Sequence, residues 1–204
     1  MKRLGLITLM IAMVVATSCK NENADKNVDA TADEQITDAQ MKEKASKKAD
    51  SKPMGNRIAM GLESKSESTA TGKVLFTEED GVVKFEAYLM GLDPGTHAIH
   101  IHEKADCSSA DGKSSGGHWN PTHTAHGKWG AAEGYHKGDI GNFVVDESGN
   151  GKITMETDEW CIGCGDENKD IVGKAIIVHQ GTDDFTSQPS GAAGARVSCG
   201  GIIK

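Results

Sequence analysis

The sequence lacks a hydrophobic run long enough to cross a bilayer as an ordinary helix. Its most apolar stretch covers only residues 4–16 and follows Lys2 and Arg3. A short apolar run behind a charged start is typical of a secretory signal rather than of a membrane span. We therefore expect residues 1–18 to be an export signal.

The apolar run ends in small residues and a cysteine, Ala16-Thr17-Ser18-Cys19. This arrangement resembles a bacterial lipoprotein signal, in which the cysteine becomes the lipid-bearing N-terminus. The alternative is an ordinary signal peptide with an incidental cysteine. We expect an extracytoplasmic lipoprotein anchored in the membrane through Cys19, facing the periplasm or displayed at the cell surface.

Residues 20–55 lack aromatic side chains altogether and have few large aliphatic ones. Seven Lys nearly balance eight Asp and Glu. Such a segment cannot bury enough apolar surface to offset its chain entropy. We expect residues 19–55 to be a lipid-anchored, flexible linker.

Residues 56–204 lack an excess of positive charge. They contain 13 Lys and Arg against 22 Asp and Glu, a formal charge of −9. This balance argues against a nucleic-acid partner. The length is sufficient for one domain with a hydrophobic core.

The same region also lacks convincing helical periodicity. Short strand-like stretches are separated instead by Gly-, Pro- and Asp-rich turns, a pattern that predicts an all-β, Greek-key antiparallel β-sandwich or barrel of immunoglobulin-like type. The predicted strands are Arg57–Leu62, Gly72–Phe76, Val82–Leu89, His97–His102, Asn142–Val145, Lys152–Glu156, Lys174–His179 and Ala195–Ile202. The stretch 103–139 has almost no strand character, and a loop of that length in a compact domain is usually functional.

All eight histidines lie between His97 and His179. On a strand, His100 and His102 project from one face, so both imidazoles can reach one metal ion while Ile99 and Ile101 face the opposite way. His97 has the parity of the isoleucines, and we expect it to be a hydrogen-bonded structural histidine.

The long loop adds further imidazoles and one carboxylate, and a distant strand ends in another imidazole. Neutral imidazole with a carboxylate suits zinc, and imidazole also suits copper. The residues are His118, His123, His126, His136, Asp139 and His179. Spacing alone predicts an imidazole-rich centre with room for two metal ions.

Four cysteines remain after Cys19, an even number that suits disulfides in an oxidising compartment. Two of them form the motif Cys161-x-x-Cys164. We favour a local disulfide for this pair. The alternatives are a redox-active pair and a site that acquires copper through thiolates.

Six motifs, in order from about Gly72 to Ile202, resemble the copper–zinc superoxide dismutase family. They are Gly91-Leu92-x-Pro94-Gly95-x-His97-x-x-His100-x-His102-Glu103, Gly116-Gly117-His118-Trp119-Asn120-Pro121, His126-Gly127, His136-x-Gly138-Asp139, Val178-His179 with Asp183-Asp184, and Gly191-x-x-Gly194-x-Arg196-x-x-Cys199-Gly200.

The resemblance implies a role for each matched residue. Copper ligands would be His100, His102, His118 and His179; zinc ligands would be His118, His126, His136 and Asp139. His118 would be an imidazolate shared by both metals, and Asp183 would link His100 to His126. Arg196 would receive the anion, and Cys107 would pair with Cys199. His123 matches no motif, and we expect it to be a solvated loop residue.

The resemblance also implies the reaction, which is dismutation of superoxide to dioxygen and hydrogen peroxide. Because the domain is acidic, attraction of this anion must be local, from the metal, Arg196 and any nearby lysine. Lys128 and Lys137 are candidates for steering, although solvated lysines are equally expected there. The alternative function is a non-catalytic copper- and zinc-binding or copper-delivery lipoprotein. The resemblance allows a homodimer as well as a monomer.

Overall fold

The computed structural model describes residues 56–204 of the chain. The predicted export signal, the lipid anchor at Cys19 and the linker 19–55 lie outside the described residues. Within residues 56–204, no helix has the length and apolar character that crossing a membrane requires.

The described residues form eight strands and one short 3-10 helix, which confirms the predicted all-β class and all eight predicted strands. The elements are β1 (Arg57–Ser64), β2 (Thr71–Glu79), β3 (Val82–Met90), β4 (Gly95–His102), η1 (Lys113–Ser115), β5 (Gly141–Val145), β6 (Gly151–Thr157), β7 (Ala175–His179) and β8 (Arg196–Gly201). The observed strands differ from the predicted ones only in where they begin and end. The β2–β3 hairpin, for example, continues its pairing to Glu79 and Val82.

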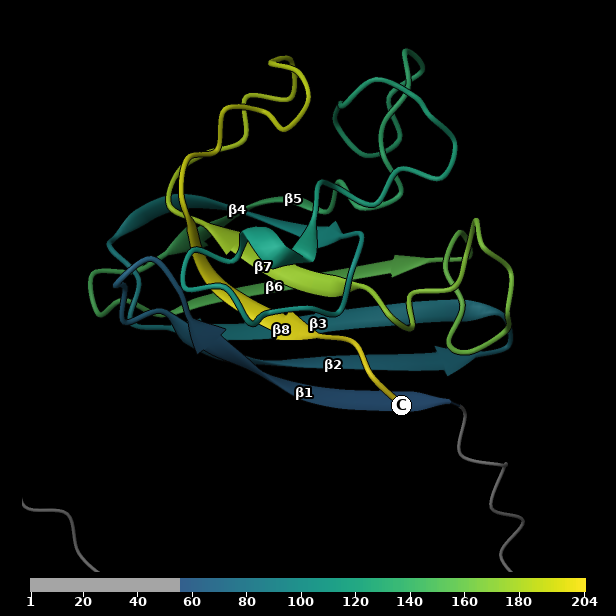
Figure 1. Ribbon diagram of the computed structural model, residues 1–204, viewed down its shortest axis with the longest axis horizontal. Helices are drawn as coiled ribbons and strands as arrows, with labels where there is room; N and C mark the ends of the chain where they lie inside the picture. The colour runs from purple at the N-terminus through teal and green to yellow at the C-terminus, as the bar shows by residue number, and fades with distance from the viewer. Residues whose placement is uncertain (1–55) are drawn as a thin grey trace, which may run out of the picture. The chain divides into compact units, whose positions relative to one another are not determined.

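The eight strands close into one antiparallel barrel in the order β1-β2-β3-β6-β5-β4-β7-β8. Strand β3 pairs with β6 instead of with β4, so the chain crosses over in Greek-key fashion. Two long connections, 103–140 and 180–195, project from the same side of the barrel (Figure 1). The first carries His118, His126, His136 and Asp139, and the second carries Asp183.

The barrel interior is filled by alternating apolar residues of the strands. In β3, Val83, Phe85 and Ala87 are fully buried, while Lys84 lies between them at the surface. The Phe85 ring lies 5.2 Å from the ring of Phe76 on β2. Burial of each phenylalanine contributes about 2 kcal/mol through apolar area removed from water.

Strand β4 differs from β3 because both of its faces are covered. Ile99 and Ile101 belong to the barrel interior, and His100 and His102 on the other face are equally buried. The long loops cover this outer face. The predicted opposition of isoleucines and histidines is thereby confirmed, and it gives the site a rigid floor.

A disulfide joins Cys107 in the long loop to Cys199 on β8, with Cα atoms 5.8 Å apart. Cys199 packs with Ile177 on the same outer face as His100. Because the bridge closes a segment of 92 residues, loop-closure entropy assigns it about 4.6 kcal/mol of stabilisation. It fixes the start of the metal-binding loop to the barrel.

Candidate metal centre

Two groups of buried side chains lie next to one another and share His118. In each group, one ligand atom per residue lies within 4.8 Å of all the others. The first group is His100, His102, His118 and His179, and the second is His118, His126, His136 and Asp139. The structure thus brings together every residue that the resemblance assigned to copper and to zinc.

Strands supply the first group. His100 and His102 point outward from β4, opposite Ile177 and Ala175 of β7. His179 ends β7 at an irregularity in its pairing with β8. His118 reaches the same place through an isolated bridge to His102.

The long loop is laid along β4 by main-chain hydrogen bonds, and this places the second group. Trp119 N–H donates to the carbonyl of Ile101 at 2.8 Å, and Ile101 N–H donates to the carbonyl of Gly138 at 2.9 Å. Gly138 is required at this approach because a Cβ there would collide with the Ile101 carbonyl. His118 and Asp139 are each one residue from these anchors and are therefore held together.

Six buried imidazole nitrogens within residues 56–204 have no hydrogen-bond partner. They are His100 Nδ1, His102 Nε2, His118 Nε2, His126 Nδ1, His136 Nδ1 and His179 Nε2. A buried polar atom without a partner is costly and rare in folded proteins. All six belong to the two groups, so the donor set fits copper and zinc as ligands of these atoms.

The second nitrogen of most of these rings is hydrogen-bonded, which fixes the tautomer and orientation of each ring. His102 Nδ1 lies 2.9 Å from the carbonyl of Gly116, and His179 Nδ1 lies 3.5 Å from that of Gly194. His118 differs because Nδ1 lies 2.8 Å from Asp139 Oδ1 while Nε2 faces the first group. Its ring therefore has one nitrogen in each group.

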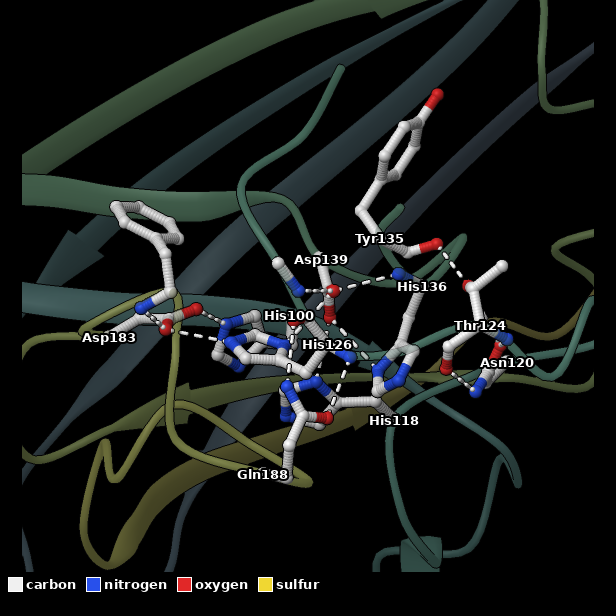
Figure 2. Close-up of polar contacts among 12 residues, drawn as sticks. His100, His118, Asn120, Thr124, His126, Tyr135, His136, Asp139, Asp183 and Gln188 are labelled. Atoms are coloured by element: carbon white, nitrogen blue, oxygen red, sulfur yellow. Dashed lines mark hydrogen bonds and ion pairs between the residues drawn. The ribbon is translucent and has the colours of Figure 1, made fainter. Parts of the chain in front are cut away.

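Asp183 connects the two groups from the loop between β7 and β8. Its carboxylate lies 2.8 Å from His100 Nε2 through Oδ2 and 2.8 Å from His126 Nε2 through Oδ1 (Figure 2). Gly191, with φ +68°, packs directly on this carboxylate, where a Cβ would collide. The predicted position of Asp183 between His100 and His126 is thus what the structure shows.

Asp139 faces three imidazoles and also ties down the loop. Its Oδ2 accepts N–H bonds from Gly127 at 3.1 Å and from His136 at 2.8 Å. The Nδ1 atoms of His126 and His136 lie 3.0 and 3.3 Å from the carboxylate, near it but without a hydrogen bond. Burial opposes its charge, yet these contacts hold the pKa of Asp139 well below its ordinary range.

Burial sets the charge of the first group. Desolvation lowers the pKa of His102 and His179 well below the ordinary value, and it lowers the pKa of His118 to about 4 against the opposing effect of Asp139. These rings are neutral and ready to act as ligands.

In His126, which belongs to the second group, burial lowers the pKa, but Asp139 and Asp183 outweigh it and raise the pKa to about 9. A cation is therefore favoured at this position.

Arg196 lies at the edge of the first group. It begins β8 opposite His179, and its side chain is half-buried. Its Nη1 donates to the carbonyl of Gly112 at 2.9 Å and to Ser115 Oγ at 3.1 Å. Ser115 Oγ in turn donates to the same carbonyl at 2.8 Å. One guanidinium nitrogen is thereby fixed to the η1 segment beside the metal ligands.

Two other histidines lie outside both groups, as expected. His97 is buried between main-chain carbonyls, 3.0 Å from that of His179 and 2.8 Å from that of Asp93. His123 is exposed and lines a surface cavity. Of the two lysines considered for steering, Lys137 has its ammonium paired with the Glu159 carboxylate, which offsets its charge. Lys128 is exposed in the loop.

Sequence reasoning missed the residues that hold the loops from a distance. Ser115 supports Arg196, and Trp160 Nε1 donates to the carbonyl of Lys137 at 2.9 Å. The only available signals were a serine before the Gly116-Gly117 pair and a tryptophan among polar residues.

Comparison with known proteins gives one family. Its model, described as copper/zinc superoxide dismutase, matches residues 70–202. A curated relative from Aquifex aeolicus, superoxide dismutase (Cu-Zn) 2, is 34% identical over 139 residues, which cover 67% of this chain and 81% of that protein. A superoxide dismutase (Cu-Zn) from Caulobacter vibrioides is 38% identical over 139 residues, covering 65% and 78%.

Solved structures agree on the fold. The clock protein EA4 is 33% identical with a TM-score of 0.62, and the match covers 74% of this chain and 96% of that one. A double mutant of a SOD-like protein from Bacillus subtilis is 32% identical with a TM-score of 0.64, covering 72% and 97%.

Proposed function

Because the chain belongs to the copper/zinc superoxide dismutase family, we propose that this oxidoreductase dismutes superoxide at a copper ion bridged to zinc by the imidazolate of His118. Copper and zinc are its cofactors. The observation that carries the proposal is the division of the His118 ring, with Nδ1 in the Asp139 group and an unpartnered Nε2 in the His100 group. His100, His102 and His179 would complete the copper site, and His126, His136 and Asp139 the zinc site.

When bound, copper supplies a one-electron acceptor and donor, and zinc supplies a fixed positive charge. The protein has to orient the anion and deliver protons. Arg196 can hold the anion, since the contacts of Nη1 with Gly112 and Ser115 fix its guanidinium at the edge of the first group. A preorganised donor of this kind costs no reorganisation during turnover.

His118 can also hold and release a proton at Nε2. Its side chain is 2% exposed, so the proton would be exchanged inside the site while Nδ1 stays directed at Asp139. Asp183 keeps His100 and His126 in place on either side, so that His118 can change its protonation without rearrangement of its neighbours.

Charge makes the attraction of superoxide local. The domain has 22 acidic against 13 basic residues, and two divalent metals with one imidazolate reduce its formal charge of −9 only to about −6. Attraction therefore depends on the metal and Arg196, and added salt should weaken it.

The deciding measurement is the rate of superoxide decay after pulse radiolysis, with the copper- and zinc-loaded protein. A rate per copper well above that of free copper supports the proposal. Metal binding without that acceleration would instead support a copper- and zinc-binding or copper-delivery protein. An optical spectrum that shows Cu²⁺ perturbed by zinc removal would test the His118 bridge separately.

We further propose that the enzyme is a lipoprotein anchored through Cys19. The sequence supports this through the short apolar run that ends at Ala16-Thr17-Ser18-Cys19. One acyl chain gives only marginal membrane binding, so stable anchoring requires more than one chain on this cysteine. Membrane fractionation of the wild type and a Cys19→Ser variant tests the anchor, and equal release of both into the soluble fraction would disprove it.

A further inference from the structure

The segment between β6 and β7 holds a group of donor atoms that the proposed reaction does not use. Cys161 is buried and Cys164 is exposed, and the two form a disulfide. One carboxylate oxygen of Asp170 lies with both sulfurs inside a 4.8 Å group. Two thiols and a carboxylate at this spacing are a ligand set for a soft or borderline metal ion once the disulfide is opened.

Hydrogen bonds to the Asp170 carboxylate and between main-chain groups hold this loop independently of the disulfide. Asp170 Oδ1 accepts from the N–H groups of Gly163 and Val172 at 2.9 and 3.0 Å, and Oδ2 accepts from Gly165 at 2.8 Å. The Cys161 N–H also donates to the main-chain carbonyl of Lys169, and the Cys161 carbonyl accepts from the N–H of Ile171. Opening the S–S bond therefore leaves both sulfurs close together on a formed loop.

Asp170 has spare capacity as a ligand. A carboxylate offers about four lone-pair positions, and the three N–H groups occupy three of them, which leaves one on Oδ2. Burial would raise the pKa of Asp170, but the N–H groups and the Lys204 ammonium outweigh it and lower the pKa. The carboxylate is thus ionised, as a metal ligand must be.

A cavity of about 590 Å³ borders this loop. Its lining includes Gly165, next to Cys164, and one ammonium, that of Lys174. Four carboxylates outnumber this ammonium, those of Glu103, Asp166, Glu167 and Asp170. A cleft with an excess of negative charge concentrates cations. The lining also includes Trp119, the residue that follows His118.

We propose that two-electron reduction of the Cys161–Cys164 disulfide opens a metal site that binds one soft or borderline ion, such as Cu⁺ or Zn²⁺, through both thiolates and Asp170. The site is separate from the two groups that share His118 and does not depend on the dismutase proposal. In the disulfide form, the sulfurs are not available as thiolate ligands. The redox state of the cysteine pair thus decides whether this site holds a metal ion.

The reductant is a dithiol, such as the active site of a thioredoxin-like oxidoreductase. One of its thiolates attacks Cys164 Sγ, the exposed sulfur, and the Cys161 sulfur leaves as a thiolate. The second thiolate of the reductant then displaces Cys164 and closes the disulfide of the reductant. Cys164 leaves as a thiolate 3.5 Å from the Asp166 N–H, which stabilises it. Two electrons pass to the pair, and any protons taken up are released again when the metal binds.

The test uses the full chain with copper and zinc already loaded, so that the histidine sites are occupied. Dithiothreitol is applied under native conditions and removed anaerobically, and alkylated cysteines are located by peptide mass mapping. Cd²⁺ is then added as the probe, and the ultraviolet thiolate-to-cadmium charge-transfer band is followed.

We expect labelling of Cys161 and Cys164 while the Cys107–Cys199 bridge stays intact, because Cys199 is fully buried. We expect one Cd²⁺ per reduced chain, with no such band before reduction or in a Cys161→Ser, Cys164→Ser double variant. Resistance of the pair to reduction until the chain unfolds, or reduction without a band, would overturn the proposal.

Two matched variants test Asp170 as a ligand. Asp170→Asn should weaken Cd²⁺ binding about tenfold or more, the size of effect that follows the loss of a residue supporting a metal site. Glu167→Gln removes the same charge from the same cavity and should weaken binding much less. Equal effects of the two variants would exclude Asp170 as a donor, whereas the double serine variant still tests the thiolates.

Discussion

Trp160 Nε1 donates a hydrogen bond to the main-chain carbonyl of Lys137 at 2.9 Å, across 23 residues of sequence. Lys137 follows His136 and lies two residues before Asp139, so this bond fixes the part of the loop that supplies two candidate zinc ligands. The indole is 1% exposed and packs edge-on against Phe76 and Phe85. It anchors the loop to the barrel core.

We predict that Trp160→Phe weakens zinc retention and lowers stability. The variant keeps an aromatic ring but leaves the Lys137 carbonyl without its donor, which costs about 1–3 kcal/mol when the group is buried. Zinc loss to a chelator and the free energy of unfolding are the measurements. Trp129→Phe is the control. The ring centroids of Trp129 and Trp160 are 5.4 Å apart in the same aromatic cluster, and replacing Trp129 leaves the Trp160 hydrogen bond intact. Zinc retention equal in both variants would contradict the anchoring role.

Asp183 makes a second prediction, that one substitution weakens both metal sites. Asp183→Asn keeps the shape of the side chain but can no longer accept from both His100 and His126. Loss of such a partner typically costs 10- to 100-fold in metal affinity. The measurement is the copper and zinc content after dialysis against a graded series of chelator concentrations. Asp184→Asn, at the exposed neighbouring residue, is the control. If only one metal were lost, the carboxylate would not couple the two sites.

The strands and the ligands could be predicted because their signals are local. Alternation along β3 and β4 follows from which side chains face the core, and His100-x-His102 places two imidazoles on one face in any strand. The division of the ligands into two groups that share His118 followed from the order of the motifs. Spacing could not predict it, because side chains along an irregular loop have no fixed periodicity.

The supports of the site could not be predicted because they depend on how the loops close. Glu159 lies 22 residues from Lys137, and Ser115 lies 81 residues from Arg196. No local pattern links such pairs, so the sequence could not show that the charge of Lys137, a candidate for steering, is paired with that of Glu159. The hydrogen bonds of Asp170 that shape the Cys161–Cys164 loop are equally invisible in a motif.

Glu159 gives a pH-dependent prediction. Burial would raise its pKa, but Lys137 and Tyr135 outweigh it and hold the pKa below the ordinary value. Its oxygens face the Lys137 ammonium and accept from Tyr135 Oη at 2.6 Å. A lowered pKa means that the stabilisation is fully present above the pKa of the unfolded chain, about 4.3, and is lost as the pH falls through the folded-state pKa.

We therefore expect Glu159→Gln to lower the free energy of unfolding by about 1 kcal/mol at neutral pH, a value reduced for the partial exposure of the pair. The difference from the wild type should shrink as the pH falls below about 4. Denaturant titrations across this range, with the exposed Glu167→Gln as control, give the measurement. A difference that grew with acidification would mean that the carboxylate is not stabilised by its partners.

Arg196 leads to the prediction that bears most directly on turnover. Its guanidinium is the basic group placed beside His102 and His179, in a domain whose net charge repels superoxide. Arg196→Ala should lower the rate of superoxide decay by about tenfold or more and flatten its dependence on salt, because local steering is lost. Copper and zinc content should stay unchanged, since Arg196 touches the η1 segment at Gly112 and Ser115 and supplies no ligand. Ser115→Ala should give a smaller loss of rate, because one of the two contacts that hold the guanidinium remains. If Arg196→Ala lost metal together with activity, the residue would be a structural support of the loop and not the docking group for the anion.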